Sequence, residues 1–420
     1  MDQQSYLLAT LVAVTSVFGL GLSMFMLGSV KLRLTEKLNI DNAQMGKLFS
    51  VYNFSNLVFV LVAGIVCDQF GYKTVAVGGF LAAAMAMFCL GQASSYTLAV
   101  LACLFLGVGS MFMNTAGNTL LGNPNILYED PGRSANMGNV FFGVGAFCAP
   151  FLTALLFKKT SFNNTLTVMA VILLIPLIFA IAGMFPPAGG NFSASAAAAL
   201  IGQSQIILCA LALMCYIALE VSMAGWITTY MTSVGADETK ASQVLSFFSV
   251  AIMAGRLFTA LVIGGFLNLA AHGQWFVAVL AVVAAIVIYS MRTVNNVGTG
   301  TSLVILIGLL FAPMFPTIAG LMFARTDPSV QGTGFSIIFA IGLIGAIFVP
   351  AYMGKISSGP GKTIKDSMVV AAAVAAILVV IAVIMGFALP EPLGAAPAAV
   401  ESAVESAVDA ATEAAGSVAP

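Results

Sequence analysis

Charged side chains are scarce along the whole chain. Only 7% of the 420 residues are Asp, Glu, Lys or Arg, and 60% are hydrophobic. A soluble domain averages about 25% charged and about 45–50% apolar residues, because it needs the charges to cover its surface. So little charge excludes a soluble fold of this length. The sequence therefore indicates a membrane protein, with the lipid bilayer as its apolar solvent.

Histidine is nearly absent, and the cysteines lack the spacing of metal ligands. His272 is the only histidine, which argues against a metal cluster and against a histidine-based catalytic triad. None of the six cysteines has CxxC or Cys/His spacing, so we expect packing residues and neither a metal site nor a disulfide framework. The net charge of -1 gives no reason to expect nucleic acid as a partner. We expect no cofactor and no enzymatic activity.

Long hydrophobic runs are what the sequence has instead. A helix that crosses a bilayer needs about 20 mostly apolar residues. Twelve runs meet this length, near 7–29, 44–66, 74–92, 97–120, 136–157, 164–184, 205–231, 241–264, 275–291, 301–323, 333–354 and 367–389. No basic stretch precedes the first run, so it is expected to span and not to be cleaved. The sequence predicts an all-α, multi-pass integral membrane protein with twelve transmembrane helices.

Composition divides the chain into four parts. Residues 185–204 contain Pro186-Pro187 and Gly189-Gly190, which is typical of a linker. We therefore predict a bundle over 1–184, a linker over 185–204 and a second bundle over 205–389. Residues 390–420 are rich in Ala, Val, Ser and Glu, which predicts a disordered or weakly helical tail.

The two predicted bundles repeat each other. Gly145-Ala146 and Pro150 recur 200 positions later as Gly345-Ala346 and Pro350, and Ser23-Met24 recurs 199 positions later as Ser222-Met223. Phe49-Ser50-Val51 likewise matches Phe248-Ser249-Val250. Each match places one span on the span six further along. We infer a duplicated six-helix unit whose pseudo-symmetric halves enclose a substrate site between them.

Asparagines inside the spans are the first candidate ligands. Asn114 and Asn118 are four residues apart on one helix face, and Asn136 and Asn139 open the next span. A carboxamide both donates and accepts, which suits a polyol substrate. The alternative is hydrogen bonding between helices, worth about 0.6–2 kcal/mol each. Asn53 and Asn56 of the second span are weaker candidates.

Aromatic residues of the seventh span complete the candidate substrate site. Trp226 lies short of the end of its span, and Tyr230 follows one turn later. Trp226 is either a stacking platform for a sugar ring or an anchor at the membrane interface.

Glu220 and Arg256 are the only acid and base deep inside spans. A carboxylate in hydrocarbon must either pair with a cation or titrate, and a titrating one is what proton coupling requires. Counting from the predicted span ends leaves about 10 Å of depth between the two residues, which does not favour a fixed ion pair. Glu220 is therefore the coupling candidate, with Arg256 as its alternative structural partner.

The connection after the second span resembles a family signature. Gly64, Asp68, Gly71 and Lys73 match the major facilitator pattern G-x-x-x-D-[RK]-x-G-[RK]-[RK], whereas Gln69 and Tyr72 replace basic residues. In that family the loop is cytoplasmic, and its Asp caps and gates the helix bundle. The resemblance implies the same fold and the same gating role here, the alternative being an ordinary turn.

Within that superfamily the chain is similar to the fucose–proton symporter group of sugar transporters. The stretches that carry this resemblance are Asn114 to Asn118, Asn136 to Ala146, Glu220-Val221, Gly225-Trp226, Tyr230, Gly255-Arg256-Leu257 and Phe315-Pro316-Thr317. The resemblance implies that the fourth and fifth spans line the sugar site. That group has a Glu at the position of Asn114 and an Asp in its first span, and this chain has neither. Glu220 is left to couple protons, or the carrier is a uniporter or uses another ion.

Charge distribution and family resemblance disagree on orientation. The resemblance places both termini in the cytoplasm, where Lys and Arg should then concentrate in even-numbered loops. Those loops hold Lys73, Arg133 and Arg325. The odd-numbered loops and adjoining helix ends hold Lys31, Arg33, Lys37, Lys47, Lys158, Lys159, Lys240, Arg292, Lys355, Lys362 and Lys365. We favour a cytoplasmic N-terminus on the strength of the signature.

The function expected from the sequence is secondary transport by alternating access. The expected substrate is a small polar solute of the sugar class, with protons as a candidate coupling ion and a monomer in the cell membrane. Two alternatives stay open. One is a carrier of drugs, peptides or organic anions, and the other is a non-transporting sensor or scaffold.

Overall fold

The computed structural model describes residues 6–187 and 194–393, and helices with their connections account for that part of the chain. The first bundle comprises α1 (Leu7–Leu38), α2 (Asn42–Gln92), α3 (Tyr96–Leu121), α4 (Pro131–Phe157), α5 (Phe162–Leu174) and α6 (Leu177–Ala182). The second comprises α8 (Ser204–Ser233), α9 (Glu238–Phe258), η3 (Thr259–Ile263), α10 (Gly264–Phe266), α11 (Leu269–Ser290), η4 (Met291–Thr293), α12 (Val297–Phe311), α13 (Met314–Phe323), η5 (Pro328–Val330), α14 (Gln331–Ser357) and α15 (Ile364–Ala388).

Eleven helices of the described part are long and apolar enough to cross a membrane. One of them, Ala43–Gln92, has 50 residues. At 1.5 Å per residue it is about 75 Å long, more than twice the thickness of a hydrocarbon core. Gly71 breaks it with φ 84°, a left-handed conformation that glycine adopts without steric cost. α2 therefore holds the second and third spans, and the chain crosses twelve times as the sequence predicts.

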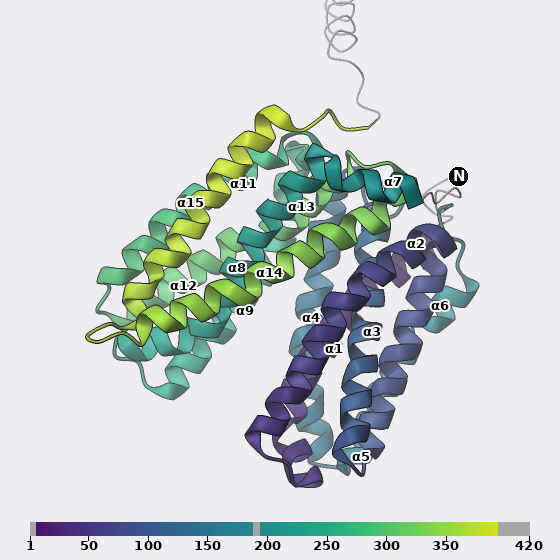
Figure 1. Ribbon diagram of the computed structural model, residues 1–420, viewed down its shortest axis with the longest axis horizontal. Helices are drawn as coiled ribbons and strands as arrows, with labels where there is room; N and C mark the ends of the chain where they lie inside the picture. The colour runs from purple at the N-terminus through teal and green to yellow at the C-terminus, as the bar shows by residue number, and fades with distance from the viewer. Residues whose placement is uncertain (1–5, 188–193, 394–420) are drawn as a thin grey trace, which may run out of the picture.

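Two hydrophobic cores underlie the two bundles. One cluster of buried side chains runs from Tyr6 to Ala180. The other runs from Leu200 to Met385 and takes in Leu20, Val60 and Met111 of the first bundle. Figure 1 shows the two bundles meeting near α7 (Ala194–Ala199) and diverging toward their other ends. Part of the expected linker, 188–193, and most of the expected tail, 394–420, lie outside the described residues.

Glycines let the first and fifth spans of each bundle cross closely. α1 packs on α4, and α8 packs on α14 in the same way. A Cβ on Gly145 would lie 2.0 Å from the Phe18 oxygen of α1, and one on Gly345 would lie 2.2 Å from the Met214 oxygen of α8. The repeated glycine found in the sequence thus serves the same helix crossing in each half, as a duplicated unit requires.

These crossings make a stability prediction. Gly145→Ala and Gly345→Ala should each lower the apparent Tm of the purified protein, because the methyl group forces the backbones apart at a cost of about 1–3 kcal/mol. Size-exclusion chromatography of heated detergent samples measures this. Gly28→Ala is the control, since nothing lies within 4 Å of a Cβ there. An unchanged Tm for both core variants would contradict the close crossing.

Candidate functional site

A cavity of about 610 Å³ lies between the two bundles, within the size range of small-molecule sites. Its polar lining consists of Ser50, Asn53, Asn56, Asn114, Asn139, Glu220 and Arg256. Its apolar lining consists of Leu20, Met24, Phe54, Leu57, Met111, Phe142, Ile217, Val221, Phe315, Phe339, Leu343, Ala346 and Ile347. Both halves contribute, so relative movement of the bundles changes the site directly.

Three of the predicted asparagines form one chain of hydrogen bonds. Asn139 Nδ2 donates to Asn118 Oδ1 at 3.0 Å, and Asn118 Nδ2 donates to Asn114 Oδ1 at 3.0 Å. Backbone carbonyls fix the orientation of two of the amides, because Asn139 Nδ2 also donates to Ala135 O and Asn118 Nδ2 to Asn114 O. The chain therefore runs in one direction and ends on the Asn114 amide nitrogen.

The Asn114 amide nitrogen is an unused donor at the cavity wall. Asn114 is 1% exposed, and its Nδ2 has no hydrogen-bond partner among the described residues. The Asn56 Oδ1 atom, on a side chain that is 4% exposed, likewise lacks a partner there. A buried polar atom without a partner costs about 1–3 kcal/mol, which a ligand atom at the same place would recover. The wall thus offers a buried donor on Asn114 and a buried acceptor on Asn56, in addition to its exposed polar groups.

Asn118 joins Asn114 to Asn139 but does not itself line the cavity, and the other three predicted ligands also lie outside its lining. Asn136 donates to Gly132 O and, across the two bundles, to Thr317 Oγ1. Trp226 Nε1 donates to Pro350 O at 3.2 Å, so it ties α8 to α14. Tyr230 donates to Met291 O and is fully buried. In this conformation all three are engaged within the protein, and none of them joins the cavity wall.

Glu220 and Arg256 form an ion pair, which the counting of span ends did not favour. Arg256 NH2 lies 3.6 Å from Glu220 Oε1. The expectation that the two residues would not pair was wrong, because helix-end counting takes no account of the length of an arginine side chain. The Glu220 side chain is 27% exposed, whereas that of Arg256 is 4% exposed. Both residues line the cavity, and the carboxylate is the more exposed of the two groups.

Arg256 also connects the two bundles. Its NH1 donates to Asn139 O of α4 at 3.2 Å, its Nε to Ala312 O at 3.1 Å, and its NH2 to the Tyr216 hydroxyl at 3.5 Å. The guanidinium is therefore occupied by protein groups. A change of charge on Glu220 would act on a contact between the halves.

The signature residues close one end of the space between the bundles. The Asp68 carboxylate accepts from Gly332 N and Thr333 N, both at 2.7 Å, at the start of α14 in the other bundle. A helix N-terminus carries partial positive charge, so it favours a carboxylate there. A Cβ on Gly64 would lie 2.5 Å from Gly332 O, so glycine permits this approach. Gly71 makes the kink already described, and Lys73 donates to Ile181 O within its own bundle.

Sequence comparison agrees with this geometry. The model of the Major Facilitator Superfamily matches residues 13–350. The chain belongs to the major facilitator superfamily. The chain is 24% identical over 333 residues to a protein named TsgA homolog from Erwinia tasmaniensis, covering 76% of this chain and 80% of that protein.

Solved major facilitator structures share the fold. A single-residue variant of the Escherichia coli fucose:proton symporter FucP is 18% identical, with a TM-score of 0.75, covering 90% of this chain and 99% of that one. FucP in the outward conformation is 16% identical, with a TM-score of 0.77, and again 90% of this chain and 99% of that one are covered. The proton:xylose symporter XylE, bound to 6-bromo-6-deoxy-D-glucose, is 12% identical, with a TM-score of 0.70. The match covers 93% of this chain and 97% of XylE. The protein is a multi-pass membrane transporter of this fold.

Two residues at the closed end of this major facilitator protein were not singled out from the sequence. Asp130 Oδ1 caps its own helix α4 through Gly132 N, and its Oδ2 accepts from Leu269 N of α11 in the other bundle at 2.6 Å. Arg133 Nε donates to Ala260 O of the π-helical turn η3 at 2.9 Å. The Asp130-Pro131 pair signals a helix start, but no local pattern names the second helix that Asp130 caps.

The Asp68 contact makes a prediction for hydrogen exchange. Asp68→Ala should speed amide exchange in the first turn of α14 about fivefold or more, because losing a cap costs about 1 kcal/mol. Mass spectrometry of peptides covering residues 331–339 measures it. Asp41→Ala is the control, since Asp41 caps its own helix through Gln44 N. Unchanged exchange at Gly332 and Thr333 would contradict the contact of Asp68 with the start of α14.

Proposed function

We propose that the protein moves a small neutral polar solute of the sugar class across the cell membrane by alternating access. The observation that carries this is the central cavity, whose wall includes the Asn114 and Asn139 amides, joined to each other by hydrogen bonds through Asn118. Amides bind hydroxyl groups without adding charge. The fucose and xylose symporters that share the fold support the same class of solute.

The state of Arg256 argues against an organic-anion carrier. An anionic substrate needs a cation free to bind it, and this guanidinium already contacts Glu220, Asn139, Ala312 and Tyr216. The acid and the base together leave this pair neutral. A neutral solute fits this wall without breaking the ion pair.

The apolar wall supports a second candidate. Phe315, Phe339 and Leu343 line the cavity on the side of the second bundle. Such a surface also suits an amphipathic, drug-like solute. Uptake of a panel of labelled sugars and of hydrophobic cations into proteoliposomes separates the two candidates.

We also infer that the termini are cytoplasmic, so that this conformation is closed toward the cytoplasm. Asp68 and Asp130 hold the bundles together at the end where α8 begins. The Asp68 signature at this end supports this orientation, because the family resemblance places that loop in the cytoplasm. A reporter enzyme that is active only outside the cytoplasm, fused to the C-terminus, tests this inference directly. Activity of that reporter would show that the orientation is the opposite one.

Asn118 provides the test of the site. Asn118→Leu should reduce sugar uptake into proteoliposomes by about tenfold or more, because it leaves Asn114 Oδ1 without its partner and removes one of the two hydrogen bonds of Asn139 Nδ2, at about 1–3 kcal/mol for the unpaired oxygen. Asn164→Leu, the same substitution at an exposed asparagine of α5, is the control and should transport normally. Normal uptake by the Asn118 variant would remove the amide chain from the site.

Glu220 provides the test of coupling. Glu220→Gln should keep counterflow exchange of the substrate but lose accumulation driven by a pH gradient, because the amide cannot carry a proton. Glu238→Gln, at an exposed glutamate of α9, is the control. Accumulation equal to the parent would refute proton coupling through Glu220. Loss of folding in both Glu220→Gln and Arg256→Gln would assign the pair a structural role.

A further inference from the structure

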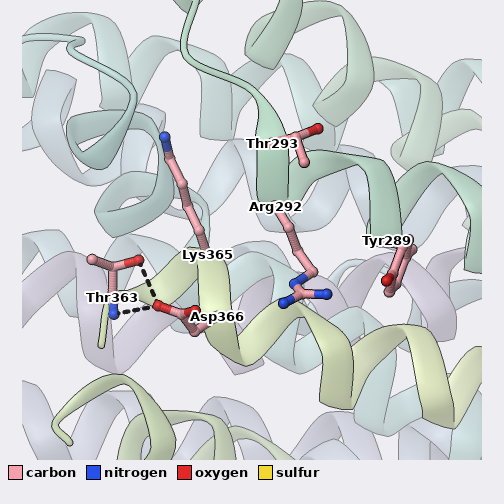
Figure 2. A pocket seen from close by; sticks show the side chains of 6 residues that line it. All are labelled: Tyr289, Arg292, Thr293, Thr363, Lys365 and Asp366. Carbon is pink, nitrogen blue, oxygen red and sulfur yellow. Dashed lines mark hydrogen bonds between the residues drawn. The ribbon is translucent and has the colours of Figure 1, made fainter. Parts of the chain in front are cut away.

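A second cavity lies away from the space between the bundles. It has a volume of about 290 Å³ and is lined by Tyr289, Arg292, Thr293, Thr363, Lys365 and Asp366 (Figure 2). These residues come from the end of α11, from η4 and from the start of α15. α11 begins beside Asp130 and runs for 22 residues, so the cavity lies at the opposite end of the spans. That level is where helices leave the hydrocarbon for the lipid headgroups.

Arg292 is a cation of this cavity that forms no ion pair within the described part of the chain. The two ion pairs of the described chain, Arg256–Glu220 and Lys362–Asp366, leave it out. Its Nε is buried and has no hydrogen-bond partner there. The guanidinium carbon lies 5.1 Å from the centroid of the Tyr289 ring, a cation–π distance that holds the group in place. The structure thus positions an arginine that has no ion-pair partner among the described residues, with the Asp366 carboxylate as the nearby anion that acts on it without direct contact.

The neighbouring charges have partners of their own, and Asp366 also interacts electrostatically with Lys362 and Arg292. Lys365 Nζ donates to Val294 O at 2.7 Å and Asn295 Oδ1 at 2.8 Å, and Figure 2 shows it pointing away from Arg292. Asp366 Oδ2 accepts from Thr363 N and Thr363 Oγ1, which closes the first turn of α15. Two cations and one carboxylate line the cavity, so the charge of its lining is +1.

An apolar stripe on α11 leads to Arg292. Val279, Ile286 and Tyr289 are 63%, 64% and 55% exposed, and their spacing puts them on one face of the helix. α15 packs beside α11 along this length. In a membrane this face lies against acyl chains, and its last residue before η4 and Arg292 is an amphipathic tyrosine.

We propose that this cavity binds the phosphate of an anionic phospholipid, with Arg292 as the contacting group. A guanidinium matches two oxygens of a phosphate and is the favoured partner for such groups. The acyl chain of the same lipid lies along the stripe of α11. The lipid holds the end of α11 to the start of α15, at the end of the spans opposite the contact of Asp68 with α14. The proposal is independent of the transported solute.

Native mass spectrometry of the full chain in detergent tests it. The wild type and Arg292→Gln are titrated with dioleoyl phosphatidylglycerol and, separately, with dioleoyl phosphatidylcholine. Arg292→Gln should lower the affinity for phosphatidylglycerol about tenfold, because hydrogen bonds to a charged group contribute about 1.5–3 kcal/mol. Arg33→Gln is the matched control: Arg33 stacks on Phe157 at 4.9 Å near the end of α1 and should leave binding unchanged.

Three results would overturn the proposal. The first is equal phosphatidylglycerol binding by Arg292→Gln and Arg33→Gln. The second is displacement of the lipid by equimolar inorganic phosphate, which would make the cavity a site for free anions. The third concerns Arg292→Lys, which keeps the charge and loses the planar fork. Wild-type binding by that variant would show that the phosphate is not held by the guanidinium as proposed.

Discussion

The absence of water inside the bilayer is the constraint on which the rest of this structure depends. Every polar group placed in hydrocarbon must find its partner within the protein. The amides of Asn114, Asn118 and Asn139 answer this by binding one another in a single direction. Glu220 and Arg256 answer it as an ion pair. The few polar atoms left without partners at the cavity wall, on Asn114 and Asn56, are therefore the ones available to a solute.

The scarcity of charged residues also explains how the bundles hold together at one end. The acidic side chains of Asp68 and Asp130 each accept from backbone N–H groups at the start of a helix in the opposite bundle. Such contacts need one charge and no partner cation, because the helix end supplies the positive potential. They are also readily exchanged for water when the end opens. Arg256, which donates to Asn139 O of the other bundle, forms a similar contact between two residues of the cavity lining. Contacts at the site and contacts at the closed end therefore both affect the same equilibrium between two arrangements of the bundles.

Hydropathy predicted the twelve spans because the bilayer imposes both their length and their composition. Their ends were less predictable: α1 continues to Leu38, carrying Lys31, Arg33 and Lys37 beyond the apolar run that ends near Ser29. Contacts between helices were not accessible from spacing. The Glu220–Arg256 pair depends on how far an arginine side chain extends, and the second partner of Asp130 depends on how the bundles meet. The direction of the amide chain depends on backbone carbonyls that no sequence pattern identifies.

Alternating access is the central claim, and pulsed electron spin resonance measures it most directly. Spin labels at Phe70 and Pro328 report the closed end, and labels at Leu32 and Ser358 report the opposite end, each pair joining the two bundles. On addition of a transported sugar in nanodiscs, the first distance should lengthen in part of the population while the second shortens. Distances that stay fixed at both ends in the presence of that sugar, or that lengthen together, would contradict the account.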